Sequence, residues 1–153
     1  MDLRRGIRGG WIALLAALLD RLTKRWALGA GRARALVPGI LNLRPVENEG
    51  MAFSMLSGQT VALSVLTALL IAGLVGWLVA RPNGHPLARA GLWLIVGGGL
   101  GNLYDRFAAG SVTDFLELAF VRFAVFNVAD VCICVGAALV ILGVWMAERK
   151  QAA

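Results

Sequence analysis

The feature that most constrains this chain is a run of twenty residues without a charge, residues 61–80. As an α-helix, such a run extends about 30 Å, which matches the hydrocarbon thickness of a bilayer. Residues 81–84, Arg-Pro-Asn-Gly, then end the helix. A second charge-free run covers residues 131–147 and is followed directly by charged residues. Both runs are typical of membrane-spanning helices.

The composition favours lipid as the solvent for most of the chain. Of the 153 residues, 59% are apolar and 16% are charged, and the mean hydropathy is +0.75. A typical soluble chain is about 45–50% apolar and about 25% charged. A domain of this length cannot bury so much apolar surface, and the same numbers exclude intrinsic disorder. The net charge of +6 is typical of basic residues that flank membrane helices, and no basic stripe with interleaved aromatic residues points to nucleic acid.

Two weaker apolar segments complete a four-helix pattern. Residues 87–104 contain four glycines within positions 97–101, which let another helix or a ligand approach closely. Residues 11–28 are apolar at first and charged from Asp20 onward. A signal peptide is the alternative for this segment, but no small-residue cleavage site follows the apolar run. We expect a membrane helix with a charged outer end, on which Asp20 and Lys24 pair at i and i+4.

The predicted fold class is an all-α integral membrane protein with four transmembrane helices, a small extracytoplasmic β platform and a lid. One membrane-embedded domain, residues 1–153, is expected. Its helices cover approximately residues 11–28, 61–80, 87–104 and 128–147, and its long outer loops cover residues 29–60 and 105–127. Strand-like stretches at residues 41–46 and 112–126 lie within these loops.

Four spans place both chain termini on one side of the membrane. That side carries seven basic residues in short segments, against eight on the other side. The density in short segments leans towards cytoplasmic termini, whereas the raw count does not decide the orientation.

This topology gathers polar residues on the outer membrane surface, where ionisable groups are costly and usually functional. They are Asp20, Lys24, Asn48, Glu49, Gly50, Asn102, Asp105, Arg106, Asp114, Asn127 and Asp130. The set contains no histidine for a Ser-His or Cys-His arrangement and no ligand set for zinc. The candidate catalytic groups that remain in this set are its carboxylates. Two aspartates that share one proton can activate a water and protonate a carbonyl, which hydrolyses a peptide bond without a metal.

The residues themselves leave the aspartate assignment open among Asp105, Asp114 and Asp130, because each has a simpler explanation. Asp105 and Arg106 are adjacent, as in an interfacial charge pair. Asp130 can cap the last helix, since a carboxylate satisfies the free N–H groups of a helix N-terminus. Asp114 can belong to a turn, and Asp20 is expected to pair with Lys24.

Five short motifs nevertheless occur in register with the four spans. They are D-x-x-x-K at residues 20–24, N-x-G-x-A-F at 48–53, G-G-x-x-G-N-x-x-D-R at 97–106, V-x-D-F at 112–115 and F-N-x-A-D at 126–130. In this order they make the chain resemble the lipoprotein signal peptidase family, also called signal peptidase II. The resemblance covers about residues 11–147.

The resemblance implies that Asp114 and Asp130 are the catalytic pair of an aspartyl endopeptidase. The implied substrate is a bacterial prolipoprotein with diacylglycerol on its lipobox cysteine, which is cut just before that cysteine. The resemblance implies that supporting or substrate-binding roles fall to Asp20, Lys24, Asn48, Gly50, Asn102, Asp105, Arg106, Asn127 and Ala129. It further implies inhibition by globomycin, contact with membrane lipid, and neither a metal nor an organic cofactor.

The resemblance also implies a location in the bacterial inner membrane, with cytoplasmic termini and the site at the outer face, and a monomer suffices. Two other functions remain as alternatives. A small transporter would place charge within its spans, whereas the middles of residues 61–80 and 131–147 have none. A non-catalytic membrane scaffold would tolerate substitution of both Asp114 and Asp130.

Overall fold

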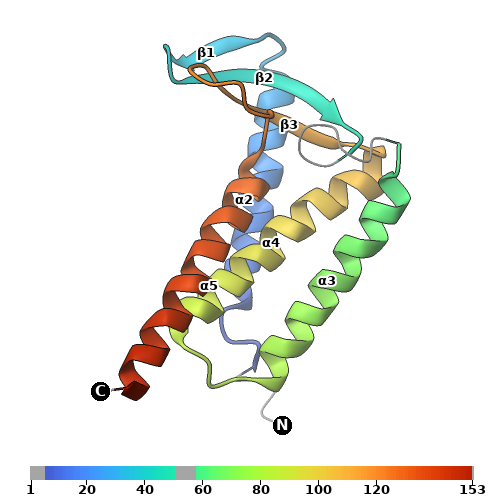
Figure 1. The fold of residues 1–153 in the computed structure, drawn as a ribbon. Coiled ribbons are helices and arrows are strands. Elements are labelled where there is room, and N and C mark those ends of the chain that lie inside the picture. The colour runs from blue at the N-terminus through green and yellow to red at the C-terminus, as the bar shows by residue number, and fades with distance from the viewer. Residues whose placement is uncertain (1–5, 51–57, 153) are drawn as a thin grey trace.

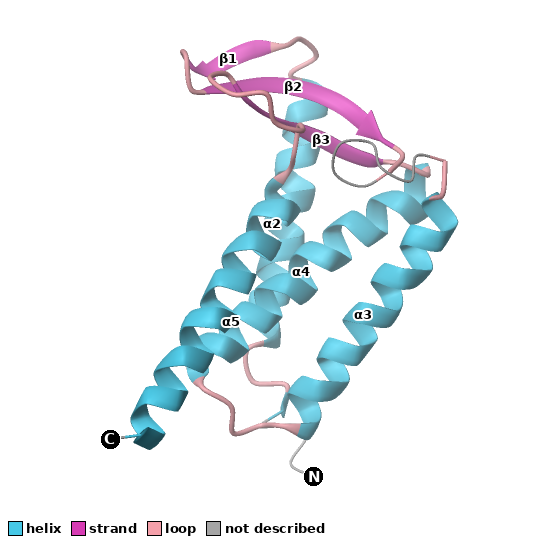
Figure 2. Ribbon diagram, viewed as in Figure 1, coloured by secondary structure: helices cyan, strands magenta, loops and turns pink. Residues whose placement is uncertain are grey.

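The computed structural model describes residues 6–50 and 58–152. Long helices run side by side, and a three-stranded antiparallel sheet covers one end of them (Figures 1 and 2). The helices are α2 (Gly10–Gly29), α3 (Thr60–Ala80), α4 (Pro86–Ala109) and α5 (Val128–Ala152). The strands are β1 (Arg34–Val37), β2 (Leu41–Asn48) and β3 (Val112–Leu118), in the order β1-β2-β3. The protein is therefore mostly helical with the small sheet that the sequence predicts.

Two of the helices are long and apolar enough to cross a membrane. They are Thr60–Ala80, with a mean hydropathy of 2.3, and Val128–Lys150, with a mean hydropathy of 2.4. Large apolar side chains such as Val61 and Leu69 on α3 and Ile141 on α5 are exposed, as expected for helices solvated by lipid. Helices α2 and α4, which carry the charged outer ends, do not meet this criterion, so four transmembrane helices remain a prediction.

Helix α4 occupies the centre of the bundle and contacts the other three helices. Its glycines make close packing possible, because a side chain there would collide with a neighbouring helix. A Cβ atom at Gly97 would lie 2.6 Å from the carbonyl oxygen of Ala13 on α2, and one at Gly98 would collide with that of Ala129 on α5. The predicted role of these glycines, close approach of a helix, is therefore confirmed.

Helix α4 ends later than the sequence predicts. Gly110 has a φ of +78°, a conformation that glycine adopts at little cost, and its N–H donates to the carbonyl of Arg106 at 3.0 Å. The second outer loop therefore begins at residue 110 rather than 105, and Asp105 and Arg106 lie on the last turns of the helix.

The sheet is placed so that one face of β3 is directed towards the helices. Strand β3 pairs with β2 through Asn48 opposite Val112 and Val46 opposite Asp114. Because side chains alternate along a strand, Asp114 faces a cavity while Phe115 packs on the other side, against Ala27 and Leu43. Phe126 bridges Leu116, which brings the chain back beside β3 immediately before α5 begins.

Candidate active site

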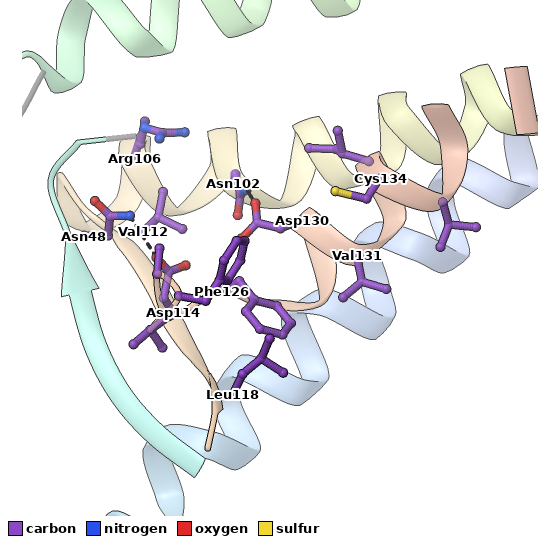
Figure 3. Close-up of a pocket in the computed structure, with 15 residues that line it drawn as sticks. Asn48, Asn102, Arg106, Val112, Asp114, Leu118, Phe126, Asp130, Val131 and Cys134 are labelled. Carbon is purple, nitrogen blue, oxygen red and sulfur yellow. Dashed lines mark hydrogen bonds between the residues drawn. The ribbon is translucent and has the colours of Figure 1, made fainter. Parts of the chain in front are cut away.

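Asp114 and Asp130 line the same cavity, of about 500 Å³, beneath the sheet (Figure 3). Asp114 comes from β3 and is 3% exposed. Asp130 lies in the first turn of α5. The structure thus brings together, from two different elements, the two aspartates that the resemblance singles out, which lie sixteen positions apart in the sequence.

Asn127 connects the two carboxylates. Its backbone N–H donates to Oδ2 of Asp130 at 3.1 Å, and its side-chain Oδ1 accepts from the backbone N–H of Asp130 at 3.0 Å. This reciprocal pair is a capping box at the start of α5. The side-chain Nδ2 of Asn127 then donates to Oδ1 of Asp114 at 2.7 Å. The capping role considered for Asp130 is therefore real, and it holds the carboxylate in the cavity rather than competing with a role there.

Further amides orient each carboxylate. Asn48, at the end of β2, donates from Nδ2 to Oδ2 of Asp114 at 2.8 Å. Asn102, on α4, donates from Nδ2 to Oδ1 of Asp130 at 2.9 Å. The Oδ1 atom of Asn102 accepts from Lys24 Nζ at 2.9 Å and from Asn127 Nδ2 at 3.0 Å. With these donors on Oδ1, the amide of Asn102 can present only its N–H₂ group to Asp130.

Beneath these amides lies a buried charge cluster that joins α2 to α4. Lys24 Nζ lies 2.8 Å from Asp20 Oδ2 and 2.8 Å from Asp105 Oδ2. Asp20 Oδ1 accepts from the backbone N–H of Ala129 at 2.9 Å, so the cluster also reaches the start of α5. The predicted pairing of Asp20 with Lys24 is confirmed.

The structure corrects the proposed pairing of Asp105 with Arg106. Asp105 instead forms ion pairs with Lys24 and with Arg21, whose Nη1 lies 2.8 Å from Asp105 Oδ1. Sequence reasoning missed Arg21, which falls in a variable position of its motif. Its only signal was its place beside Asp20 at the charged end of the first helix.

Arg106 turns towards the cavity and the first outer loop. Its Nη2 donates to the carbonyl of Gly50 at 3.0 Å, and the N–H of Gly50 donates to Oδ1 of Asn48 at 2.9 Å. The Nε of Arg106 is buried and has no hydrogen-bond partner among the described residues. The remainder of this motif, Met51 to Phe53, lies outside the described residues.

The electrostatics of the two aspartates are unequal. Burial raises the pKa of Asp114 from 3.8 to about 6; hydrogen bonds from Asn48 and Asn127 oppose this rise, and repulsion by the carboxylate of Asp130 adds to it. Asp130 lies in the first turn of α5, where the helix dipole favours a negative charge. A carboxyl group with a raised pKa, such as Asp114, is suited to donate a proton. Within the described residues no cluster of three or more His, Cys, Asp or Glu is placed to hold a metal ion.

Most of the cavity wall is apolar. Its apolar lining comes from β3, from the segment before α5 and from the first turns of α5: Val112, Leu118, Phe123, Phe126, Val131, Ile133 and Val135. The carboxylates and amides lie together in this apolar setting (Figure 3). Such a cavity can hold an apolar ligand and present one polar bond to two carboxyl groups. Val112 and Phe126 belong to the V-x-D-F and F-N-x-A-D motifs, whereas no motif marked Leu118, Phe123, Val131, Ile133 or Val135.

The fold defines the class of protein. Two solved structures described as bacterial membrane enzymes are similar to it. One has a TM-score of 0.84 at 25% identity and covers 94% of this chain and 91% of that one. The other has a TM-score of 0.79 at 26% identity and covers 90% and 92%. The chain is thus similar in fold to membrane enzymes.

The sequence comparisons specify the family. Residues 12–146 match the model of signal peptidase II. A lipoprotein signal peptidase of Gloeobacter violaceus is 40% identical over 147 residues, which cover 94% of this chain and 85% of that protein. Another, of Symbiobacterium thermophilum, is 38% identical over 149 residues, which cover 93% and 97%. The chain belongs to the signal peptidase II family and is therefore a peptidase, as the motifs predict.

Proposed function

We propose that this chain removes the signal peptide from prolipoproteins that carry diacylglycerol on the lipobox cysteine, cutting just before that cysteine. The observation that carries the proposal is the pair Asp114 and Asp130 at the polar part of an apolar cavity, connected by Asn127. Family membership and the names of the relatives support the substrate.

In the proposed reaction Asp130 is the base and Asp114 is the acid. Asp130 takes a proton from a water, whose oxygen attacks the scissile carbonyl carbon, while Asp114 gives its proton to the carbonyl oxygen. Asp130 then passes its proton to the departing amine of the cysteine as the C–N bond breaks, and Asp114 regains a proton from the hydroxyl group. The raised pKa of Asp114 and the helix-terminal position of Asp130 support this division.

The surroundings have roles in the same proposal. Asn48, Asn102 and Asn127 orient the two carboxylates, and Arg106, held by Gly50, offers its unpaired Nε to the backbone of the substrate. Lys24, with Asp20 and Asp105, fixes α2 to α4. The N–H of Ala129 ties α5 to this cluster.

The same proposal covers the membrane. All four helices span it, the whole chain is one membrane-embedded domain, and the termini lie in the cytoplasm. The site then lies at the outer face of the bacterial inner membrane, where water reaches the scissile bond and the diacylglyceryl chains remain in hydrocarbon along the apolar cavity wall. Globomycin would enter the same cavity between the carboxylates. One copy contains every residue of the proposed site.

The decisive experiment replaces each carboxyl group by an amide. Asp114→Asn and Asp130→Asn are each expected to abolish cleavage of a purified diacylglyceryl-modified prolipoprotein, while the variant proteins still insert into membranes. Glu117→Gln is the matched control, because Glu117 lies on the same strand but pairs with Arg44 at 2.8 Å. Normal cleavage by both variants would refute the aspartyl mechanism and restore a scaffold or transporter as the explanation.

A further inference from the structure

A second groove lies between α2 and α4, with a volume of about 570 Å³. It shares no lining residue with the cavity of Asp114 and Asp130. Its walls include Ala17 and Leu18 from α2 and Leu103 and Phe107 from α4. The groove is therefore a distinct feature, formed on another face of the central helix, and the proposed proteolytic reaction makes no use of it.

The groove has an apolar floor and a basic rim. Leu18 and Phe107 are exposed, at 54% and 73%, and in a lipid-solvated bundle such side chains face acyl chains. Arg21 and Arg25 both line the groove and stand one turn apart on α2, at i and i+4, so their guanidinium groups share one helix face. Tyr104 adds an aromatic side chain to this rim.

The two arginines differ in how their charges are balanced. Arg21 is paired with Asp105, and its guanidinium lies 4.2 Å from the centre of the Tyr104 ring, which fixes its position. Arg25 is exposed and has no ion pair among the described residues. Like charges at i and i+4 repel each other. The rim therefore carries one uncompensated positive charge beside a positioned guanidinium, and an anion placed between the two would relieve the repulsion.

We propose that this groove binds a phospholipid with an anionic headgroup, whose phosphate lies between Arg21 and Arg25 and one of whose acyl chains fills the apolar floor. A guanidinium pairs with phosphate oxygens through two parallel hydrogen bonds. The position of Arg25 along α2 also suits contact with a lipid headgroup. Arg25 precedes the end of α2 by one turn and is followed by exposed Trp26, and tryptophan and arginine side chains both concentrate at the headgroup level.

The test counts lipids bound to the full-length protein and needs no substrate, so its outcome is independent of the proposed proteolysis. Detergent-purified protein is titrated with phosphatidylglycerol or with phosphatidylcholine of the same chains, and bound lipid is measured by native mass spectrometry. We expect one phosphatidylglycerol to bind in preference to phosphatidylcholine. Arg25→Gln should weaken that binding about fivefold, as expected for one basic side chain at a lipid headgroup.

Two variants separate the rim from the floor. Ala17→Leu fills the groove without changing charge and should lower the binding of both lipids. Arg34→Gln, on exposed β1, removes the same charge away from the groove and should bind as the wild type does.

Three results overturn the proposal. Equal binding of the two lipids by the wild type removes the role of the anionic headgroup. An equal loss of phosphatidylglycerol binding in Arg25→Gln and Arg34→Gln would mean that binding depends on the net charge of the protein and not on the groove. Displacement of phosphatidylglycerol by an equimolar diacylglyceryl peptide assigns the groove to the lipid chains of a substrate instead.

Discussion

At the scale of single residues, Asp114 is held in a state that costs stability. Its folded-state pKa of about 6 lies above the ordinary value of 3.8. The unfolded chain therefore loses this proton first as pH rises, and the folded state loses stability between about pH 4 and pH 6. Above about pH 6, the stability of the folded state stays lower by a constant amount, because the carboxylate is buried. Retaining a residue with this cost is typical of groups selected for chemistry rather than for folding.

This penalty predicts that Asp114→Asn stabilises the protein while it abolishes cleavage. A shift of about two pKa units corresponds to at most about 3 kcal/mol. We expect about 1–2 kcal/mol of it to be regained at pH 7.5, because the introduced NH₂ group faces one of the two amide donors, Asn48 or Asn127, and offsets part of the gain. Thermal unfolding in detergent at pH 7.5 and pH 4 measures the effect, which should shrink at the lower pH, where the carboxyl is protonated in the folded state. Glu117→Gln should show no such gain, and a destabilised Asp114→Asn would contradict the assignment.

The hydrogen bond from Asn48 predicts the direction of a pH shift. Because this bond stabilises the ionised form of Asp114, its removal in Asn48→Ala should raise the pKa of Asp114 further. If Asp114 must be protonated to act, kcat/KM falls as pH rises through its pKa. The falling limb of the plot of kcat/KM against pH should then move to higher pH. The expected shift is about one pH unit, because that is the contribution of a hydrogen bond to a charged group.

The pH profile of cleavage has a matched control in Asn42→Ala. Asn42 donates to Glu117 rather than to Asp114, so its removal should leave the limb in place. A limb that stays fixed in Asn48→Ala, or moves to lower pH, would assign the titration to another group.

At the scale of elements, α4 sets the distances within the site through its glycines. Gly98→Ala would bring a Cβ against the carbonyl of Ala129, one residue before Asp130. Helix α5 must then shift, and a displacement of about 1 Å in a catalytic group can lower a rate about a hundredfold. Gly73→Ala on α3 is the control, because a Cβ there meets nothing within 4 Å. Cleavage by the purified variants should fall strongly for Gly98→Ala and not for Gly73→Ala. Equal cleavage rates of the two variants would mean that the packing of α4 against α5 does not set the geometry of the site.

The charge cluster makes the placement of α2 dependent on Lys24. Lys24→Met leaves Asp20 and Asp105 buried without their shared cation, and breaking such a buried pair typically costs about 3–5 kcal/mol. Unfolding in detergent should show this loss, whereas Lys24→Met combined with Asp20→Asn and Asp105→Asn should recover part of it. A single variant as stable as the wild type would mean that the cluster contributes nothing to holding α2.

The elements also show where sequence reasoning stops. The positions of α3 and α5 follow from charge-free runs, and the i, i+4 pair Asp20 and Lys24 follows from local spacing. The ion pair between Asp105 and Arg21 does not follow from any local pattern, because it joins residues 84 positions apart. The bridge between Leu116 and Phe126, which positions Asn127 beside Asp114, likewise depends on a chain reversal that no local pattern specifies. The motifs identified the polar residues, whereas long-range packing decides which of them touch.

At the scale of the whole molecule, the sheet and the proposed site lie at the end of the bundle opposite the turn between α3 and α4 (Figure 1). That turn is next to Arg81 and Arg89, and Arg149 near the C-terminus lies 4.1 Å from the ring centre of Trp145. Arginines beside an aromatic residue suit a membrane interface on the cytoplasmic side. The raw count of basic residues does not decide the orientation, so cytoplasmic termini remain part of the proposal.

The proposed orientation predicts which end of the molecule a reagent reaches from outside. In a chain with Cys132→Ser and Cys134→Ser, a cysteine in place of Arg34 on β1 should react with a membrane-impermeant maleimide in intact spheroplasts. A cysteine in place of Asn83, in the turn between α3 and α4, should react only after the membrane is opened. The reverse pattern would place the site in the cytoplasm, where a diacylglyceryl precursor awaiting export could not be the substrate. Labelling of both positions from outside would mean that α3, which lies between them in the sequence, does not cross the membrane.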